Sequence, residues 1–271
     1  GCDLVLDARA VSRPGSRGYE LDEIVDLSSS QSRVRLASPI SVRSWRAAHA
    51  ALATPVYSHL SEALRPDNHL LKGSLTDPWL ARDRVAAGHH TLLGGYCQFP
   101  KFFENRRSEL SSRLRSQFAV ARHGPTYAAI HVRRGDYLDP LIRERFGLPS
   151  LDYYARAIAT LLSKHVLVIS DDRGWCEDVL APELASATTA HVEVAPGQSP
   201  REDFGLLLGA EELVIANSTF SWWAAFAGEA TQVVAPYPWL VDGSSNHLLQ
   251  AGWRVLDAHS GVRVRYGSGS E

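Results

Sequence analysis

The second half of this 271-residue chain alternates short apolar runs with helical patterns, and this alternation is what most constrains the fold. The runs are rich in Val, Ile and Ala and lack the polar alternation of a half-exposed strand. This is typical of strands buried on both faces of a parallel sheet. The predicted strands are Tyr127–Val132, His165–Ser170, His191–Ala195, Leu213–Asn217 and Gln232–Pro236.

Helix signals separate these strands. Ser150 can cap a helix through Ile158, a second helix is predicted over Gly174–Leu180, and Ser199-Pro200 opens a third that includes Phe204–Ala210. Strands joined by helical crossovers predict an α/β fold with a doubly wound parallel sheet. Right-handed crossovers would bring the carboxyl ends of the strands to one rim, and with them three polar segments. These are His131–Arg134, Asp171-Asp172 and Asn217–Ser221.

The first half is less regular. Strands are predicted at Leu4–Asp7 and Arg33–Leu36, and helices at Ser44–Leu52 and Phe102–Phe118. The stretch from Leu64 to Gly88 is rich in polar and turn residues, so we expect it to cross the surface. The turn-forming Arg122-His123-Gly124-Pro125 predicts a domain boundary, which divides the chain into residues 1–124 and 125–271.

Composition narrows the function classes. The net charge of -2 and pI near 6.6 give no sign of a nucleic-acid partner. The three cysteines lack C-x-x-C spacing, which favours a reducing compartment without a thiolate zinc site. No apolar run is long enough for a membrane span. The chain opens within a strand-like run and contains no methionine, so we expect the natural amino terminus to precede Gly1.

The first of two chemical junctions follows the strand at Tyr127. The apolar run passes directly into His131-Val132-Arg133-Arg134-Gly135-Asp136-Tyr137. Guanidinium is permanently charged and grips phosphate with a planar fork, so two arginines at the carboxyl end of a buried strand suggest a nucleotide diphosphate. The alternative is a surface charge pair with Asp136 as partner.

The second junction leads from the strand at Leu213 into a helix that begins near Phe220. Between them lie Asn217, Ser218 and Thr219, which can cap the helix while its free backbone N–H groups point at a phosphate. Alternatively these residues only cap, and Trp222 and Trp223 pack in the core. No GxGxxG follows a strand and no GxxxxGK[ST] occurs, which argues against dinucleotide oxidoreductases and P-loop hydrolases.

Three motifs share their order and spacing with one enzyme family. They read HVRRGDY at 131–137, SDDRGW at 170–175 and ANSTFSWWAA at 216–225, and Gly95-Tyr96-Cys97-Gln98 before Lys101-Phe102-Phe103 adds a fourth stretch. Together they resemble the alpha-1,2-fucosyltransferase family, glycosyltransferase family 11, of bacterial type. The resemblance is good over residues 90–240. The family's amino-terminal glycine-rich segment, GGLGNQ-[ML]-F-Q, has no counterpart here.

The resemblance implies a GT-B-like fold with two Rossmann-like domains. An acceptor-side domain would occupy residues 1–124, and a GDP-fucose-binding domain residues 125–271. It also implies an inverting enzyme that needs no metal or other cofactor and moves fucose from GDP-fucose to the 2-hydroxyl of a beta-galactoside. The alternative is a non-catalytic GDP-sugar or glycan-binding module of the same fold.

The same resemblance gives the phosphate-binding residues their roles. As the bond between fucose and GDP breaks, negative charge grows on the beta-phosphate, and Arg133 is expected to contact it. Arg134 would contribute less, or brace the loop together with Asp136. Backbone N–H groups and hydroxyls at the second junction would complete the donor site. The residues expected there are Asn217, Ser218, Thr219, Phe220 and Ser221.

Guanine recognition needs an acceptor for ring N–H groups, and Asp203 with His131 as companion matches that role by similarity. Alternatively, Asp203 only stabilises a helix dipole. Asp171-Asp172 invites a metal interpretation, but the resemblance favours Asp172 as a group that orients the loop or bonds a sugar hydroxyl.

The general base that takes the acceptor's proton is not fixed by the sequence. Asp139 and Asp136 are candidates, and a base from the missing segment, or none, are the alternatives. Arginine greatly outnumbers lysine, which suggests a GC-rich bacterial genome. We therefore expect a cytoplasmic enzyme, peripheral to the inner membrane at most. A Golgi enzyme trimmed of its anchor is the alternative.

Overall fold

The computed structural model describes residues 4–6, 34–36, 68–72, 90–94, 100, 103–118, 126–197 and 199–266. The chain divides into two compact units. One comprises residues 1–74 and 82–95, and the other comprises residues 75–81 and 96–271. The predicted boundary near residue 124 stays a prediction.

Two small parallel sheets are described in the first unit. One pairs β1 (Leu4–Leu6) with β2 (Val34–Leu36), and the other pairs β3 (Asn68–Lys72) with β4 (His90–Gly94). The two strands predicted in this region are confirmed. β3 lies within the stretch 64–88 that was expected to cross the surface, and the surface position of that stretch stays a prediction. The helix predicted at Ser44–Leu52 lies outside the described residues.

The second unit is built on a six-stranded parallel sheet in the order β10-β9-β8-β5-β6-β7. Its strands are β5 (Ala128–Val132), β6 (His165–Ser170), β7 (His191–Val194), β8 (Glu212–Val214), β9 (Gln232–Tyr237) and β10 (Arg254–Asp257). All five strands predicted here are confirmed, and β10 was missed. The doubly wound parallel α/β fold is therefore shown for this unit, while the two-domain GT-B arrangement stays a prediction.

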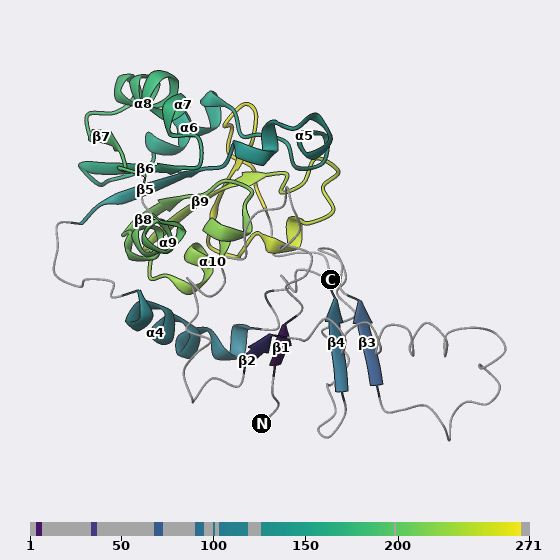
Figure 1. Ribbon diagram of the computed structural model, residues 1–271. Coiled ribbons are helices and arrows are strands. Elements are labelled where there is room, and N and C mark those ends of the chain that lie inside the picture. The colour runs from purple at the N-terminus through teal and green to yellow at the C-terminus, as the bar shows by residue number, and fades with distance from the viewer. Residues whose placement is uncertain are drawn as a thin grey trace. The chain divides into compact units, whose positions relative to one another are not determined.

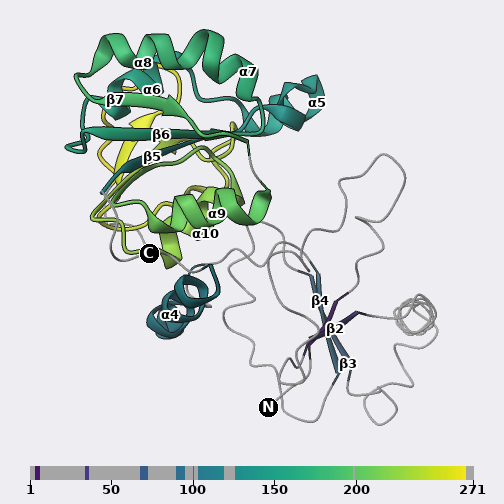
Figure 2. The ribbon, with the colours of Figure 1, turned by 60° about the vertical axis from the view of Figure 1, so that its left-hand side comes forward.

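Helices cover both faces of this sheet (Figures 1 and 2). One face packs against α6 (Leu151–Ile158), α7 (Arg173–Trp175), the π-helix η5 (Cys176–Leu180) and α8 (Ala181–Ala187). The other face packs against α9 (Pro200–Gly209) and α10 (Thr219–Ala227). The helix α4 (Arg107–Gln117) contacts both α9 and α10. Shorter elements complete the unit: η3 (Glu104–Arg106), η4 (Gly135–Leu138), α5 (Pro140–Phe146) and η6 (Asn246–Leu248).

The predicted caps open the helices as expected. Ser150 accepts a hydrogen bond from the Tyr153 N–H, and Ser199 forms a capping box with Glu202. The amphipathic α6 then buries Tyr153, whose hydroxyl donates to the Ile215 carbonyl at 2.7 Å. This bond fixes the chain at the point where it leaves β8, which is also where the second chemical junction begins.

The core beneath α10 is aromatic. Trp222 is fully buried and its ring stacks on that of Phe226 at 4.8 Å, while Trp223 is only partly buried. The alternative in which both tryptophans pack in the core is thus confirmed, with Trp222 inside the core and Trp223 packed against it. The stacked rings of Trp222 and Phe226 anchor α10, whose amino terminus faces the rim of the sheet.

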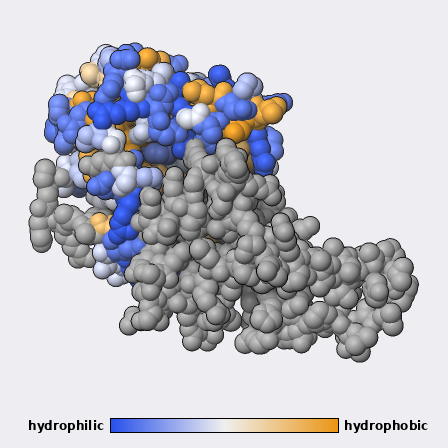
Figure 3. Space-filling model, in the orientation of Figure 1, coloured by the Kyte–Doolittle hydropathy of each residue, from blue (hydrophilic) through white to orange (hydrophobic). Residues whose placement is uncertain are grey.

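On the face shown in Figure 3, the described residues of the second unit are mostly hydrophilic, with an apolar patch over α5. Leu141 of α5 is 79% exposed, and Leu138 of η4 is also exposed. Among the described residues, no helix combines the length and the apolarity that crossing a bilayer requires.

Candidate functional site

The predicted site residues lie at the topological switch point of the sheet. From β5 the chain runs outward through β6 to β7, then returns to β8 on the other side of β5 and continues to β9 and β10. The connections after β5 and β8 therefore leave in opposite directions, and a topology of this kind places the ligand crevice at the carboxyl ends of these two strands. This is where open α/β sheets bind their ligands. Both chemical junctions flank this crevice.

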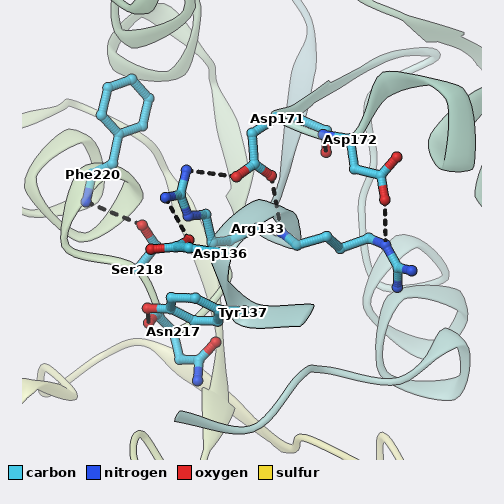
Figure 4. A network of polar contacts seen from close by, with 10 residues as sticks. Arg133, Asp136, Tyr137, Asp171, Asp172, Asn217, Ser218 and Phe220 are labelled. Atoms are coloured by element: carbon cyan, nitrogen blue, oxygen red, sulfur yellow. Dashed lines mark hydrogen bonds and ion pairs between the residues drawn. The ribbon is translucent and has the colours of Figure 1, made fainter. Parts of the chain in front are cut away.

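Arg133 stands at its centre, held between two carboxylates (Figure 4). Its Nη1 lies 2.6 Å from Asp171 Oδ2 and its Nη2 lies 2.7 Å from Asp136 Oδ1. The arginine side chain is only 14% exposed, so these pairs are shielded from solvent more than surface salt bridges are. A guanidinium has five N–H donors, and the two contacts leave it further donors for a ligand.

Arg134 points to the other side and is fixed differently. Its Nε lies 2.9 Å from Asp172 Oδ2, and its guanidinium stacks 3.8 Å from the centre of the Trp175 ring. The expected partnership of Arg134 with Asp136 is therefore wrong. Asp136 pairs with Arg133, which precedes it by three residues. The loop-bracing role fits Arg134, but its partner is Asp172.

Asp171 is a site residue that the sequence analysis did not assign. Besides pairing with Arg133, its Oδ1 accepts the backbone N–H of Arg134 at 2.9 Å. It also explains Gly135, because a Cβ at that position would collide with the Asp171 carboxylate. The signal that could have found it is the convergence of the loops after β5 and β6, both of which end at the same rim.

At the start of α10, Ser218 is the N-cap and accepts a hydrogen bond from the Phe220 N–H at 3.3 Å. Thr219 is exposed at the first helical position, so its hydroxyl can reach a ligand. Ser221 cannot: it is fully buried, and its hydroxyl donates inward to the Ala216 and Ser218 carbonyls. The expectation that the Ser221 hydroxyl contacts a phosphate does not fit this geometry.

Asn217 holds loops together. Its buried amide nitrogen donates to the carbonyls of Phe146 and Trp239. Its own backbone carbonyl accepts the buried Tyr137 hydroxyl at 3.1 Å. Tyr137, another residue without an earlier role, thus ties the arginine loop to the loop before α10, and Asn217 supports the site from behind.

His131 lies below the rim, and its ring is 5.6 Å from that of Phe220. Burial lowers the pKa of His131 from 6.5 to about 4, although the nearby Asp171 opposes the shift. The buried Nδ1 has no hydrogen-bond partner among the described residues. A neutral, partly unsatisfied imidazole beside the crevice is suited to bond a polar ligand group.

Asp203 belongs to the first turn of α9 and is partly buried. The next residue, Phe204, contacts the Phe220 ring at 5.4 Å, which places Asp203 near the same aromatic group as His131. Its position suits both guanine recognition and stabilisation of the helix dipole. Both interpretations therefore stay open.

The candidate bases have other partners. Asp139 is the N-cap of α5, and its Oδ1 accepts the Leu141 N–H at 2.9 Å. Asp136 is paired with Arg133 but remains exposed. The acidic pair after β6 is likewise engaged by the two arginines. Among the described residues, the one cluster of three or more His, Cys, Asp or Glu side chains with metal-ligand spacing lies elsewhere.

Relatives of this chain include several sugar transferases. It is 30% identical over 46% of its length to an O-antigen biosynthesis glycosyltransferase, WbnK, from Escherichia coli. It is 31% identical over 41% to an alpha-1,2-colitosyltransferase from the same organism, and 32% identical over 55% to the galactoside 2-alpha-L-fucosyltransferase SEC1 of Bos taurus. The chain spans 43%, 40% and 42% of these relatives' own lengths.

Among solved structures, POFUT1 in complex with GDP is matched with a TM-score of 0.34 and 14% identity. That match covers 58% of this chain and 57% of the other. A likeness at this level carries no conclusion here.

A family match reaches further than these pairwise comparisons. The sequence model of Glycosyl transferase family 11 matches residues 95–254, more than half of the chain. The matched range contains the whole parallel sheet up to the start of β10, together with both junctions of the crevice. The chain therefore belongs to glycosyl transferase family 11.

Proposed function

We propose that this chain carries the donor-binding part of an inverting, metal-independent alpha-1,2-fucosyltransferase. The substrate pair would be GDP-fucose and a beta-galactoside. The single observation that supports this most is Arg133, anchored by two carboxylates at the switch point with donors left for a phosphate. The sugar and the acceptor are proposed from relatives that are named galactoside fucosyltransferases.

The mechanism follows from the positions of these groups. GDP would lie across the crevice with its diphosphate between Arg133 and the amino terminus of α10. Thr219 and the free N–H groups of that helix turn supply further hydrogen bonds and a positive dipole end. As the bond to fucose breaks, the leaving diphosphate gains charge, and the arginine that is already in place stabilises it without reorganisation.

The nucleoside end would reach toward α9. Here the neutral His131, whose ring lies 5.6 Å from that of Phe220, and the carboxylate of Asp203 would together offer the acceptor and ring contacts that guanine requires. Asp172 keeps its loop-orienting role, because it holds Arg134 against Trp175. The acceptor hydroxyl would attack the anomeric carbon from the side opposite the diphosphate, which inverts its configuration. Its proton would pass to a general base, for which Asp136 and Asp139 are the candidates.

Transfer is tested with the protein at its full natural length. GDP-fucose and lactose are mixed with the enzyme in EDTA, and released GDP and fucosylated product are measured. We expect both at equal rates, without added metal. GDP-fucose binding without transfer would favour a binding module, and absence of binding would overturn the proposal. Because one relative is named a colitosyltransferase, GDP-colitose is the second donor to try.

A further inference from the structure

A second group of side chains suited to ligand binding lies at the opposite end of the sheet. His165 is the first residue of β6, and His191 and Glu193 belong to the neighbouring β7. The register pairs His165 with His191, and Glu193 is two residues further along β7. Side chains two apart on a strand share a face, so all three project to the same side. Their ligand atoms lie within 4.8 Å of one another.

The distances match those between ligands of one small cation. Glu193 places Oε1 3.4 Å from His165 Nε2 and Oε2 3.5 Å from His191 Nε2. In a tetrahedral zinc site with bonds of about 2.0–2.2 Å, neighbouring ligand atoms are about 3.3–3.6 Å apart. The two imidazoles are stacked with ring centres 5.4 Å apart, so rotation about their last side-chain torsion would turn both lone pairs toward one point.

The chemistry of the contacts also suits a cation. A neutral imidazole nitrogen can meet a carboxylate oxygen either as an N–H donor or, when it carries the lone pair, across a metal ion that both atoms bind. His165 Nε2 is buried and has no hydrogen-bond partner among the described residues. A shared ion would satisfy this nitrogen, the second imidazole and the carboxylate at once.

The strands below the cluster form a rigid support. Val166 and Val168 of β6 and Val192 of β7 face the opposite side, where they pack into the core with α8. The cluster itself is open to solvent, since the side chains of His191 and Glu193 are 71% and 46% exposed. β7 is the edge strand and pairs with β6 alone (Figure 2). An ion held by both strands would fasten this edge.

We propose that His165, His191 and Glu193 bind one Zn²⁺, with water completing the coordination. Two imidazoles and a carboxylate are a ligand set that zinc prefers. The site is separate from the proposed transferase site, because His165 lies six residues before Asp171, on the order of 20 Å along the strand. Its role is structural: it clamps β7 to β6 and takes no part in sugar transfer.

The test counts bound zinc in tag-free protein after equilibration with a zinc buffer. His191→Ala and Glu193→Gln are compared with the wild type and with His259→Ala, which removes an exposed imidazole elsewhere in the second unit. We expect the wild type and the His259 variant to bind one more zinc per chain than the other two. Cobalt should give a tetrahedral absorption spectrum that the same two variants lose.

Histidines outside the described residues contribute equally to all four proteins, so only the difference counts. Equal zinc content in the wild type and both cluster variants would overturn the proposal, and would mean that the histidines and Glu193 pair through protons only. Unfolding in EDTA checks the fold of each variant. If His191→Ala does not fold, Glu193→Gln decides, because it preserves size and removes only the charge. Neither result depends on transferase activity.

Discussion

Replacing each arginine by lysine tests whether Arg133 and Arg134 have different tasks. Arg133→Lys keeps a positive charge but replaces the fork by one ammonium group, which cannot hold Asp136, Asp171 and a phosphate bidentately. Losing one charge-assisted hydrogen bond to the diphosphate costs about 1.5–3 kcal/mol, a 10- to 150-fold fall in kcat/KM for GDP-fucose. Arg133→Ala loses two such bonds, or about 3–6 kcal/mol, and leaves both carboxylates facing the phosphate. We expect a fall of about 10²- to 10⁴-fold.

Arg134→Lys is the matched control. Arg134 is held by Asp172 and Trp175 and is not proposed to contact the diphosphate, so this change should lower kcat/KM by less than about tenfold while it reduces stability by about 1 kcal/mol. Initial rates at several GDP-fucose concentrations and urea unfolding of all three variants provide the data. If Arg133→Ala retains most activity, or if Arg134→Lys is as damaging as Arg133→Lys, the diphosphate does not bind as proposed.

Three further predictions concern groups around the site. Gly135→Ala should weaken GDP binding at least about tenfold in calorimetry, because the new methyl group displaces Asp171. The control Gly174→Ala, which has open space at its Cβ, should bind GDP normally. Equal affinities of the two variants would contradict the role of Asp171. Glu212→Ala should lower the free energy of unfolding by about 2–4 kcal/mol, because the buried carboxylate accepts hydrogen bonds from the backbone N–H groups of residues 162 and 163. A loss below about 1 kcal/mol would refute this structural role. The His131 pKa of about 4 lies below its unfolded value of 6.5, so only the unfolded chain gains a proton as pH falls between these values. Stability should drop by about 3 kcal/mol over that range, and His131→Gln should remove this part of the slope in urea unfolding; parallel pH profiles would show that His131 is not buried neutral.

The sheet was predictable because its central strands are apolar and its helices carry clear caps. Apolar runs such as β5 indicate burial on two faces, and Ser150 and Ser199 act within one helical turn. The edge strand β7 differs, because its His191 and Glu193 alternate with valines and are exposed. β10 was not predicted from the sequence, because its four residues, Arg254 to Asp257, carry a charge at each end and form too short an apolar pattern.

The position of the site could be predicted from the sequence, but the pairing between its arginines and carboxylates could not. Polar residues at strand ends must meet at one rim in a parallel sheet, which correctly brought Arg133 and the acidic pair together. Which carboxylate meets which arginine depends on side-chain reach between separate loops, and sequence spacing does not encode it. The pairing of Asp171 with Arg133 and the burial of Ser221 emerge only when the loops are placed in space.

The hydrogen bond from Tyr137 to Asn217 joins residues 80 positions apart in the chain. A site held together by such distant partners does not exist until the two halves of the sheet have paired. The proposed donor binding would therefore require the complete sheet rather than local order. Contacts of this sequence separation also slow folding, because a long loop must close first. Ligand would in turn stabilise the paired sheet as a whole, by about 2.7 kcal/mol at a hundred times its dissociation constant. A nascent chain that ends before β8 would therefore carry the arginine pair yet bind no GDP.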